Sequence, residues 1–325
     1  MFPVLFSLPF GEAPTPVASY GFLIAVALVL GWVLSLRFAR LDKLPADQLG
    51  TAYVLSVGAG LLAARAMWMR QHPDPSADWT AYITPAAGGL VGFAGILVGL
   101  VVAASFCQNR KQPIPAWAWL DCIAPAFMIG VVLERVGAFL AGANFGHYVE
   151  PDFALAVSFP AESLVYAVQQ RELTGIQIPA ETSLSVHPVQ LYAAILCAVG
   201  AALTFVIRSR RQYSGQVALF VLGYYGVVRY LIEDPFRHDA SLSLFKSISL
   251  GHVTGIVALG LVIAAHFSRM QKLQEQPEAV IQWTGGPWDP NAPKKKKKGK
   301  KKKKKSDKSG AKSDKKSKPK ADEKA

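Results

Sequence analysis

Long apolar segments, separated by short polar connections, constrain this chain more than any other feature. About 18 consecutive apolar residues can span a bilayer as a helix. Seven segments approach or exceed that length, and they cover residues 17–36, 50–66, 85–106, 116–136, 187–207, 215–233 and 247–267. Because a bilayer offers no water to unpaired backbone groups, such segments must be helical. The sequence therefore predicts an all-α integral membrane protein built as a bundle of seven transmembrane helices.

Basic residues occupy every second connection between these segments. They are Arg37, Arg40 and Lys43 after the first segment, Arg110 and Lys111 after the third, Arg208, Arg210 and Arg211 after the fifth, and a Lys-rich tail after the seventh. Connections rich in Lys and Arg stay in the cytoplasm. We therefore expect a multi-pass protein of the cytoplasmic membrane, with its N-terminus outside the cell and its C-terminus in the cytoplasm.

The residues that precede the first segment carry neither a basic start nor a small-residue cleavage pattern, so we expect no cleaved signal peptide. Their apolar side chains suit a short segment lying in the outer membrane interface. A frayed terminus is the alternative.

The formal net charge of +13 belongs to the tail, because residues 294–325 contain 18 lysines and only four acidic residues. Such a segment cannot bury apolar surface and is expected to be disordered. We expect it to associate with anionic lipid of the inner leaflet. A solvated tail and a nucleic-acid-binding tail are the alternatives, and no specific nucleic acid is expected.

Outside the tail, the longest segment between spans covers about residues 145–186 and is expected to form a small external head. The predicted organisation is a membrane domain at 1–270, a linker at 271–293 and the disordered tail at 294–325.

Three scattered cysteines are too few for a disulfide framework, and we interpret them as packing residues. We expect neither a metal site nor a cofactor, because no metal-ligand spacing or phosphate-binding loop is present.

Seven polar residues lie at the predicted outer ends of the spans: Tyr20, Arg65, Arg135, His187, Gln190, Arg229 and Glu233. Ionisable side chains at membrane depth are costly and usually mark a functional site. Guanidinium groups stay charged when desolvated and match the oxygens of a phosphate. We interpret the cluster as a site for a phospholipid head group.

Arg229 and Glu233 are four residues apart, so they share one helix face, and the carboxylate can hold the guanidinium in position. A structural ion pair that closes the helix end is the alternative. His187 directly precedes a proline at an expected helix start, where its imidazole can accept a proton or donate to a phosphate. A capping or interface histidine is equally compatible with this segment.

These residues lie in an ordered series of motifs that resembles the bacterial phosphatidylglycerol:prolipoprotein diacylglyceryl transferases. The resemblance covers roughly residues 1–270. Its motifs are Met1–Phe6 with Ser19–Ala25, Ala63–Arg65, Gly88–Val91, Arg135–Gly137 with Phe139, Gly142 and Gly146, His187–Tyr192, and Tyr225–Gly226 with Arg229, Glu233 and Arg237.

The resemblance implies an enzyme of the bacterial inner membrane that transfers a diacylglyceryl group from phosphatidylglycerol to the lipobox cysteine thiol of a preprolipoprotein. Arg135 and Arg229 would bind the phosphate, and Glu233 would orient Arg229. Tyr20 would shape the site and His187 would be a candidate proton acceptor for the thiol. The remaining residues implied at the substrate site are Gly146, Gln190, Arg237 and Arg65.

The chain also departs from the family pattern. Phe93 stands where the family places a histidine or tyrosine, Ala138 replaces an asparagine and Ala143 replaces an acidic residue. A non-catalytic lipid-binding paralogue, or a lipid transferase with another acceptor, therefore stays an alternative. A transporter would require polar residues that continue toward the cytoplasm, and Asp121 is the candidate for such a path.

Overall fold

The computed structural model describes residues 4–9, 15–73, 89–108, 114–238, 243–245 and 248–282. The chain divides into two compact units, Met1–Trp288 and Asp289–Ala325, and all described residues belong to the first unit. The predicted tail at 294–325 lies outside the described residues, so its disorder and its lipid contacts stay predictions.

Each of the seven apolar segments overlaps a helix. These helices are α1 (Ser19–Leu41), α2 (Ala46–Gln71), α3 (Gly92–Gln108), α4 (Ala116–Ala141), α6 (Val189–Arg210), α7 (Gln216–Val228) and α9 (Leu250–Glu275). Within the described ranges, five of them are long and apolar enough to cross a membrane, namely α1, α2, α4, α6 and α9. Helix α3 has 17 residues and α7 has 13. The helical, multi-span architecture is confirmed, and the count of seven spans stays a prediction.

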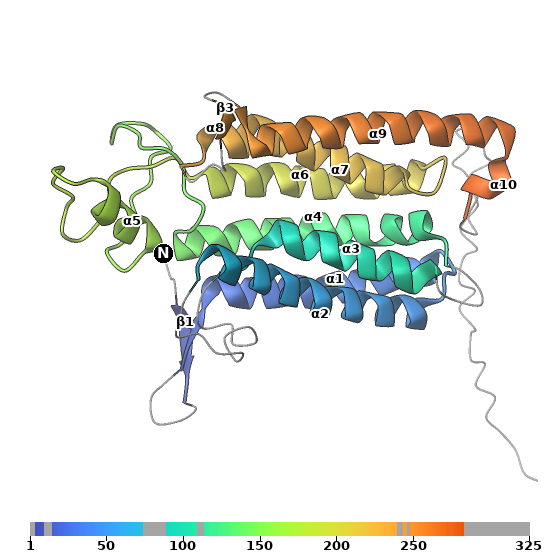
Figure 1. Ribbon diagram of the computed structural model, residues 1–325, viewed down its shortest axis with the longest axis horizontal. Coiled ribbons are helices and arrows are strands. Elements are labelled where there is room, and N and C mark those ends of the chain that lie inside the picture. Colours follow the sequence, from blue (N-terminus) through green and yellow to red (C-terminus); the bar gives the residue numbers. More distant parts are fainter. Residues whose placement is uncertain are drawn as a thin grey trace, which may run out of the picture. The chain divides into compact units, whose positions relative to one another are not determined.

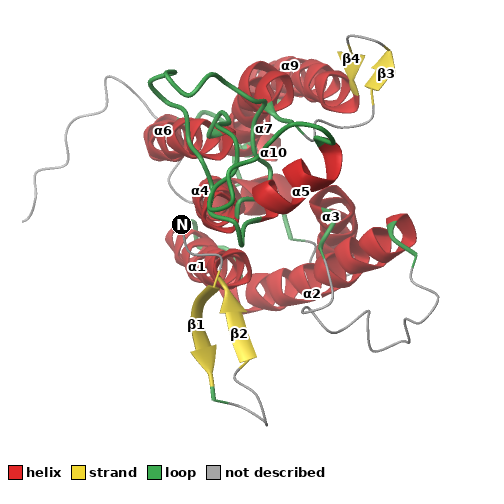
Figure 2. Ribbon diagram, turned by 90° about the vertical axis from the view of Figure 1, so that its left-hand side faces the viewer, coloured by secondary structure: helices red, strands yellow, loops and turns green. Residues whose placement is uncertain are grey.

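Helix α4 lies in the middle of the bundle, where it contacts α1, α6 and α7. An end-on view places α1, α2 and α3 on one side of α4 and α6, α7 and α9 on the other (Figure 2). Within these groups α2 packs on α3 and α7 packs on α9. The central position of α4 brings its side chains into contact with both groups.

Glycines allow α2 and α3 to approach closely. A Cβ atom on Gly60 would lie 2.8 Å from the carbonyl oxygen of Gly95, and one on Gly95 would lie 2.8 Å from the carbonyl oxygen of Gly60. Small residues at helix contacts are typical of membrane bundles, where packing rather than water exclusion holds helices together. The small residues of these apolar segments therefore determine how the helices pack.

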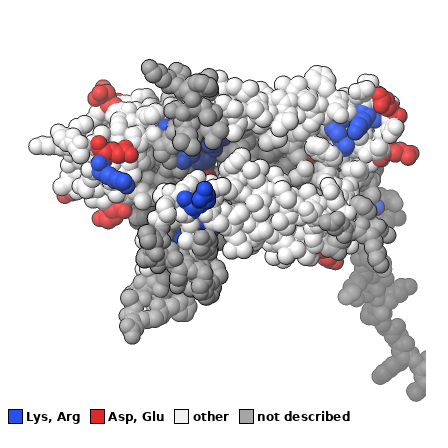
Figure 3. Space-filling model, in the orientation of Figure 1, with Lys and Arg blue, Asp and Glu red and all other residues white. Residues whose placement is uncertain are grey.

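The outside of the bundle is apolar. Side chains such as Ile195 and Phe267 are 65% and 68% exposed. On the face drawn in Figure 3, charged residues gather toward the two ends and a belt of uncharged residues lies between them. Apolar surface on this scale is unfavourable in water and is suited to contact with lipid tails.

The segment between α4 and α6 forms a head over one end of the bundle (Figure 1, left). It contains the short helix α5 (Leu164–Glu172) and packs around Phe145, Phe159, Val165 and Val186. We call the end of the bundle that carries this segment the head end and the opposite end the far end. The predicted head is therefore a packed structure, while its external location stays a prediction.

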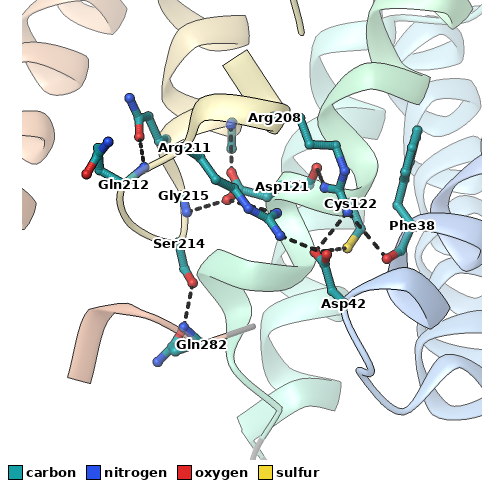
Figure 4. A network of polar contacts seen from close by, with 12 residues as sticks. Phe38, Asp42, Asp121, Cys122, Arg208, Arg211, Gln212, Ser214, Gly215 and Gln282 are labelled. Carbon is teal, nitrogen blue, oxygen red and sulfur yellow. Dashed lines mark hydrogen bonds and ion pairs between the residues drawn. The ribbon is translucent and has the colours of Figure 1, made fainter. Parts of the chain in front are cut away.

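At the far end, a buried network of Arg and Asp side chains joins α1, α4, α6 and α7 (Figure 4). Asp42 accepts hydrogen bonds from Arg208 Nη2 at 2.9 Å and from Arg211 Nη2 at 2.7 Å. Asp121 accepts hydrogen bonds from the backbone N–H groups of Gly215 at 2.8 Å and Ala218 at 3.0 Å. Asp121 therefore caps the start of α7, and these contacts give it a structural role instead of a place on a transport path.

The residues before α1 form an antiparallel hairpin of β1 (Val4–Leu8) and β2 (Thr15–Ala18). The ring of Phe6 packs edge-on against Phe22 of α1, with the ring centres 6.0 Å apart. The alternative of a frayed terminus is therefore wrong for these strands, and the predicted location in the outer interface stays untested.

Short elements flank α9 in the C-terminal part of the described chain. Strands β3 (Ser243–Phe245) and β4 (Ile248–Ser249) form a short antiparallel pair before α9, and α10 (Pro277–Val280) follows it. Val280 is buried, and its carbonyl oxygen accepts a hydrogen bond from the backbone of Ser214 at 2.9 Å. Ordered contacts thus continue into residues 271–293, the predicted linker, whose boundaries stay a prediction. The three cysteines all belong to the described residues, where they are buried and form no disulfide bond.

Candidate functional site

Arg135 and Glu233 form a buried ion pair between α4 and the end of α7. Nη2 of Arg135 lies 2.7 Å from Oε2 of Glu233, and the two side chains are 7% and 2% exposed. The same Nη2 atom donates to the hydroxyl of Tyr225 at 3.3 Å. Desolvating such charges is costly unless they are paired. The bundle therefore holds a guanidinium group at its head end in a fixed position.

Glu233 also faces Arg229. Nη1 of Arg229 lies 3.5 Å from Oε2 of Glu233, and the arginine side chain is 32% exposed. The other carboxylate oxygen, Oε1, is buried and has no hydrogen-bond partner among the described residues. The sequence predicted that Glu233 holds Arg229, but the shorter contact is with Arg135. One carboxylate thus lies between two guanidinium groups.

Arg229 and Glu233 are the first and last residues of a segment in which the helix changes type. Helix α7 continues into a π-helical segment, η3 (Arg229–Glu233), and then into α8 (Asp234–Phe236). Pro235 has no N–H to donate to the carbonyl group four residues earlier, so a regular α-helix is disfavoured here. Single π-helical turns are frequent at functional sites. The simple spacing of four residues on an α-helix therefore describes this pair only approximately.

Tyr20, at the start of α1, reaches the same cluster through Glu134. Its hydroxyl donates to Oε1 of Glu134 at 3.1 Å, and Oε2 of Glu134 lies 3.3 Å from Nε of Arg135. The second contact is an ion pair without hydrogen-bond geometry. Gly137 permits the approach, since a Cβ atom there would lie 3.2 Å from the Cα atom of Tyr20.

Arg237 and Gly146 lie where the head meets α8. Nη2 of Arg237 donates to Oδ1 of Asn144 at 2.5 Å, and Gly146 forms a β-bridge with Arg237. A Cβ atom on Gly146 would lie 2.6 Å from the Cβ and carbonyl oxygen atoms of His187. A glycine is required at this position because the backbone and His187 leave no room for a side chain.

His187 and Gln190 lie at the start of α6. Nε2 of Gln190 donates to the carbonyl oxygen of Ala143 at 2.7 Å, and its buried Oε1 has no partner within the described ranges. Nδ1 of His187 lies 3.4 Å from the hydroxyl of Tyr192. Partial burial lowers the pKa of His187 below its ordinary value of 6.5.

His187 also lines an open hollow of about 430 Å³ in the head. The remaining residues that line this hollow are Val149, Glu150, Asp152 and Phe153. A neutral imidazole at such an opening is suited to accept a proton from a molecule that enters the hollow.

Arg65 is also a predicted substrate residue, but its identified contacts are with Gly89 and Trp68 and not with the cluster around Arg135. Its Nη1 donates to the carbonyl oxygen of Gly89 at 3.2 Å, and its guanidinium lies 4.9 Å from the ring centre of Trp68. The hydrogen bond joins α2 to the residues before α3, and the ring contact lies within α2. They give Arg65 a packing role, and its predicted contact with substrate remains untested.

Two of the three residues that depart from the family pattern differ in exposure, and the third, Ala143, accepts the hydrogen bond from Gln190 through its backbone carbonyl. Phe93 lies at the start of α3 and is 64% exposed, and Ala138 is completely buried.

Within the described residues, no group of three His, Cys, Asp or Glu side chains is arranged to hold a metal ion.

Sequence reasoning missed Glu134 and Tyr225 as members of the cluster. Glu134 is an acidic residue inside an apolar segment, so the rule that selected its neighbour Arg135 applied to it equally. Tyr225 belongs to one of the motifs that resemble the family, but no role was predicted for its hydroxyl. What the sequence could not supply was the approach of α1 and α7 to the same turn of α4.

The fold and this cluster define a multi-pass, helical membrane protein with a cluster of arginines and acids at the head end of its bundle. The family model for prolipoprotein diacylglyceryl transferases matches residues 3–268. The chain therefore belongs to the prolipoprotein diacylglyceryl transferase family, as its motifs indicated.

Curated relatives agree with this assignment. The chain is 24% identical over 267 residues to the phosphatidylglycerol–prolipoprotein diacylglyceryl transferase of Lysinibacillus sphaericus, which covers 82% of this chain and 93% of the relative. It is 28% identical over 267 residues to the protein of the same name from Symbiobacterium thermophilum, with 79% and 90% covered. The similarity thus extends over the whole membrane bundle.

Proposed function

We propose that the protein transfers a diacylglyceryl group from phosphatidylglycerol to the lipobox cysteine thiol of a preprolipoprotein. The observation that carries the proposal is the pair of arginines, Arg135 and Arg229, on either side of one buried carboxylate. Among the described residues Nη1 of Arg135 makes no hydrogen bond, so that nitrogen can donate to a ligand. Two guanidinium groups at membrane depth suit the phosphate of a lipid.

In the proposed reaction the thiol loses its proton, and the sulfur attacks the glyceryl carbon that carries the phosphate. The carbon–oxygen bond to the phosphate breaks and a thioether forms. The bond electrons leave with glycerol phosphate, whose negative charge increases. Arg135 and Arg229 would stabilise this charge, because fixed donors outside water act strongly on charge that develops in the transition state.

His187 is the proposed proton acceptor for the thiol. Thiolate is the reactive form of cysteine, so removal of the proton activates the acceptor protein. Because burial lowers the pKa of His187, its imidazole is neutral near pH 7 and can take up that proton. The hollow beside His187 provides an opening through which a peptide segment could reach it.

The proposed topology has seven spans, with α3 and the continuous α7–η3–α8 segment crossing the membrane in addition to the five longer helices. The head end would face the outside of the cell and the far end the cytoplasm. This orientation is supported by the basic connections, because those after α1 and α6 both lie at the far end. The Lys-rich tail would then lie beside the anionic inner leaflet.

Complementation of a bacterium depleted of its own transferase tests the function. We expect the wild-type chain and Arg171→Ala, which changes an exposed arginine of α5, to restore growth and lipoprotein modification. Arg135→Ala should restore neither, although it should be present in the membrane. Failure of the wild-type chain despite membrane expression would contradict the proposal and favour a lipid-binding paralogue.

Reporter fusions test the topology separately. A reporter that is active only in the cytoplasm should work after α9 and fail when placed in the loop at residue 175. The opposite pattern would overturn the proposed orientation without affecting the proposed chemistry.

A further inference from the structure

Glu134 is a second carboxylate of the head-end cluster, and the proposed reaction assigns it no role. It lies between two residues of that site, since Tyr20 donates to Oε1 and Nε of Arg135 lies 3.3 Å from Oε2. Its side chain is 25% exposed, whereas that of Glu233 is 2% exposed. Glu134 is therefore more open to the surroundings of the site than its partner acid.

The contacts of Arg135 are divided between the two acids. Glu134 forms an ion pair at Nε, while Glu233 and Tyr225 both accept hydrogen bonds from Nη2. With one acid at each of these nitrogens the planar group cannot rotate without losing a contact. The remaining nitrogen, Nη1, then points in a fixed direction, and within the described residues it has no hydrogen-bond partner.

Glu134 also couples α1 to the site. Tyr20 lies on α1, and the close approach at Gly137 brings its backbone against α4. The hydrogen bond from Tyr20 to Glu134 connects this helix contact to Arg135 through a single carboxylate. A displacement of α1 would therefore be transmitted to the guanidinium group.

We propose that Glu134 is a positioning residue for the transfer reaction: it holds Nε of Arg135 and the hydroxyl of Tyr20 so that Nη1 of Arg135 faces the lipid phosphate. This inference rests on the proposed function. Glu134 is not assigned the removal of the thiol proton, because its two carboxylate oxygens already face the hydroxyl of Tyr20 and Nε of Arg135. Glu134 affects the transfer rate by fixing the position of Arg135.

The test uses the purified full chain in phosphatidylglycerol vesicles with a synthetic lipobox peptide, and it measures thioether formation by mass spectrometry. Glu134→Ala should lower kcat by about 10- to 100-fold, since small misplacements of a catalytic group have effects of this size. KM for the lipid should change less, because Arg135 acts mainly on charge that develops in the transition state. Glu134→Gln, which keeps an oxygen for Tyr20, should lose less activity.

A double-mutant cycle separates positioning from independent action. If Glu134 acts through Arg135, Glu134→Ala should reduce the rate far less in an Arg135→Lys background than in the wild type. The matched control is Glu181→Ala, which changes an exposed glutamate in the head and should behave as wild type. Thermal unfolding of every variant shows whether the protein remains folded.

Three results would overturn the inference while leaving the proposed function intact: wild-type kcat in Glu134→Ala, full additivity with Arg135→Lys, or a loss in Glu134→Gln equal to that in Glu134→Ala with a changed pH profile. The last result would identify Glu134 as a proton acceptor. An inactive wild-type chain would instead contradict the proposed function itself.

Discussion

The bundle contains two buried clusters of arginines and acids, one at each end. At the far end Asp42 receives two hydrogen bonds from arginines, and Asp121 receives two from backbone N–H groups. At the head end Oε1 of Glu233 has no hydrogen-bond partner among the described residues, and Arg229 is 32% exposed. At the far end each oxygen of the two carboxylates thus accepts a hydrogen bond, whereas at the head end only one oxygen of Glu233 does.

This difference separates a structural from a functional use of buried charge. A buried charge with all its hydrogen bonds made holds helices together and has little capacity for a ligand. A buried charge with unused hydrogen-bonding capacity has a cost in the absence of a ligand, and such sites are candidates for binding and catalysis. We therefore assign the far end to stability and the head end to lipid chemistry.

The largest expected effect is on stability at the far end. Asp42→Ala leaves Arg208 and Arg211 without their shared carboxylate, and breaking a buried ion pair in this way costs about 3–5 kcal/mol. Thermal unfolding of the purified protein should move to a lower temperature, while transfer per folded molecule should stay near wild type. Unchanged thermal unfolding would show that the far-end cluster does not hold the bundle together.

The next effect is on activity at the head end. Arg229→Ala should lower the transfer rate by about 100- to 1000-fold, the usual effect of removing one donor to developing charge. Its stability should change little because the side chain is 32% exposed. Arg210→Ala, which removes an exposed arginine near the far end, is the control and should keep both properties.

A smaller effect concerns the pH dependence. His187 has a pKa below its ordinary 6.5, so the wild-type rate should fall as the pH drops below that value and the imidazole becomes protonated. Stability should fall in the same direction, because the unfolded chain binds that proton first. His187→Gln should lower the rate at pH 7 by about 100-fold and abolish the acidic limb. A wild-type pH profile in this variant would remove His187 from the mechanism.

The smallest effect tests the cap at the far end. Asp121→Ala removes the acceptor for the N–H groups of Gly215 and Ala218, and loss of a helix cap costs about 0.5–2 kcal/mol. Asp121→Asn keeps an oxygen acceptor and should cost less. Thermal unfolding measures both variants, and a loss of transfer that exceeds the loss of folded protein would contradict a purely structural Asp121.

Much of the fold followed from the sequence because the membrane restricts the choices. Apolar length located the helices, and charge at membrane depth selected Arg135, Arg229 and Glu233. The partner of Glu233 was less predictable, since the pairing with Arg135 joins residues 98 positions apart and depends on how α4 and α7 pack. The π-helical turn and the hairpin of residues 4–18 likewise depend on local geometry that the apolar pattern does not encode.

A matched pair of Arg→Lys substitutions tests the division between the two ends most directly. Lysine keeps the charge beside the buried acids but loses the planar fork, so neither variant leaves a carboxylate without a cation. We would measure transfer rate and thermal unfolding on the same preparations of Arg135→Lys and Arg208→Lys. Arg135→Lys should lose about 100-fold in transfer with its unfolding little changed, whereas Arg208→Lys should unfold at a lower temperature and keep its transfer rate. Equal loss of transfer in both variants, in proportion to lost folded protein, would contradict this division between the two ends.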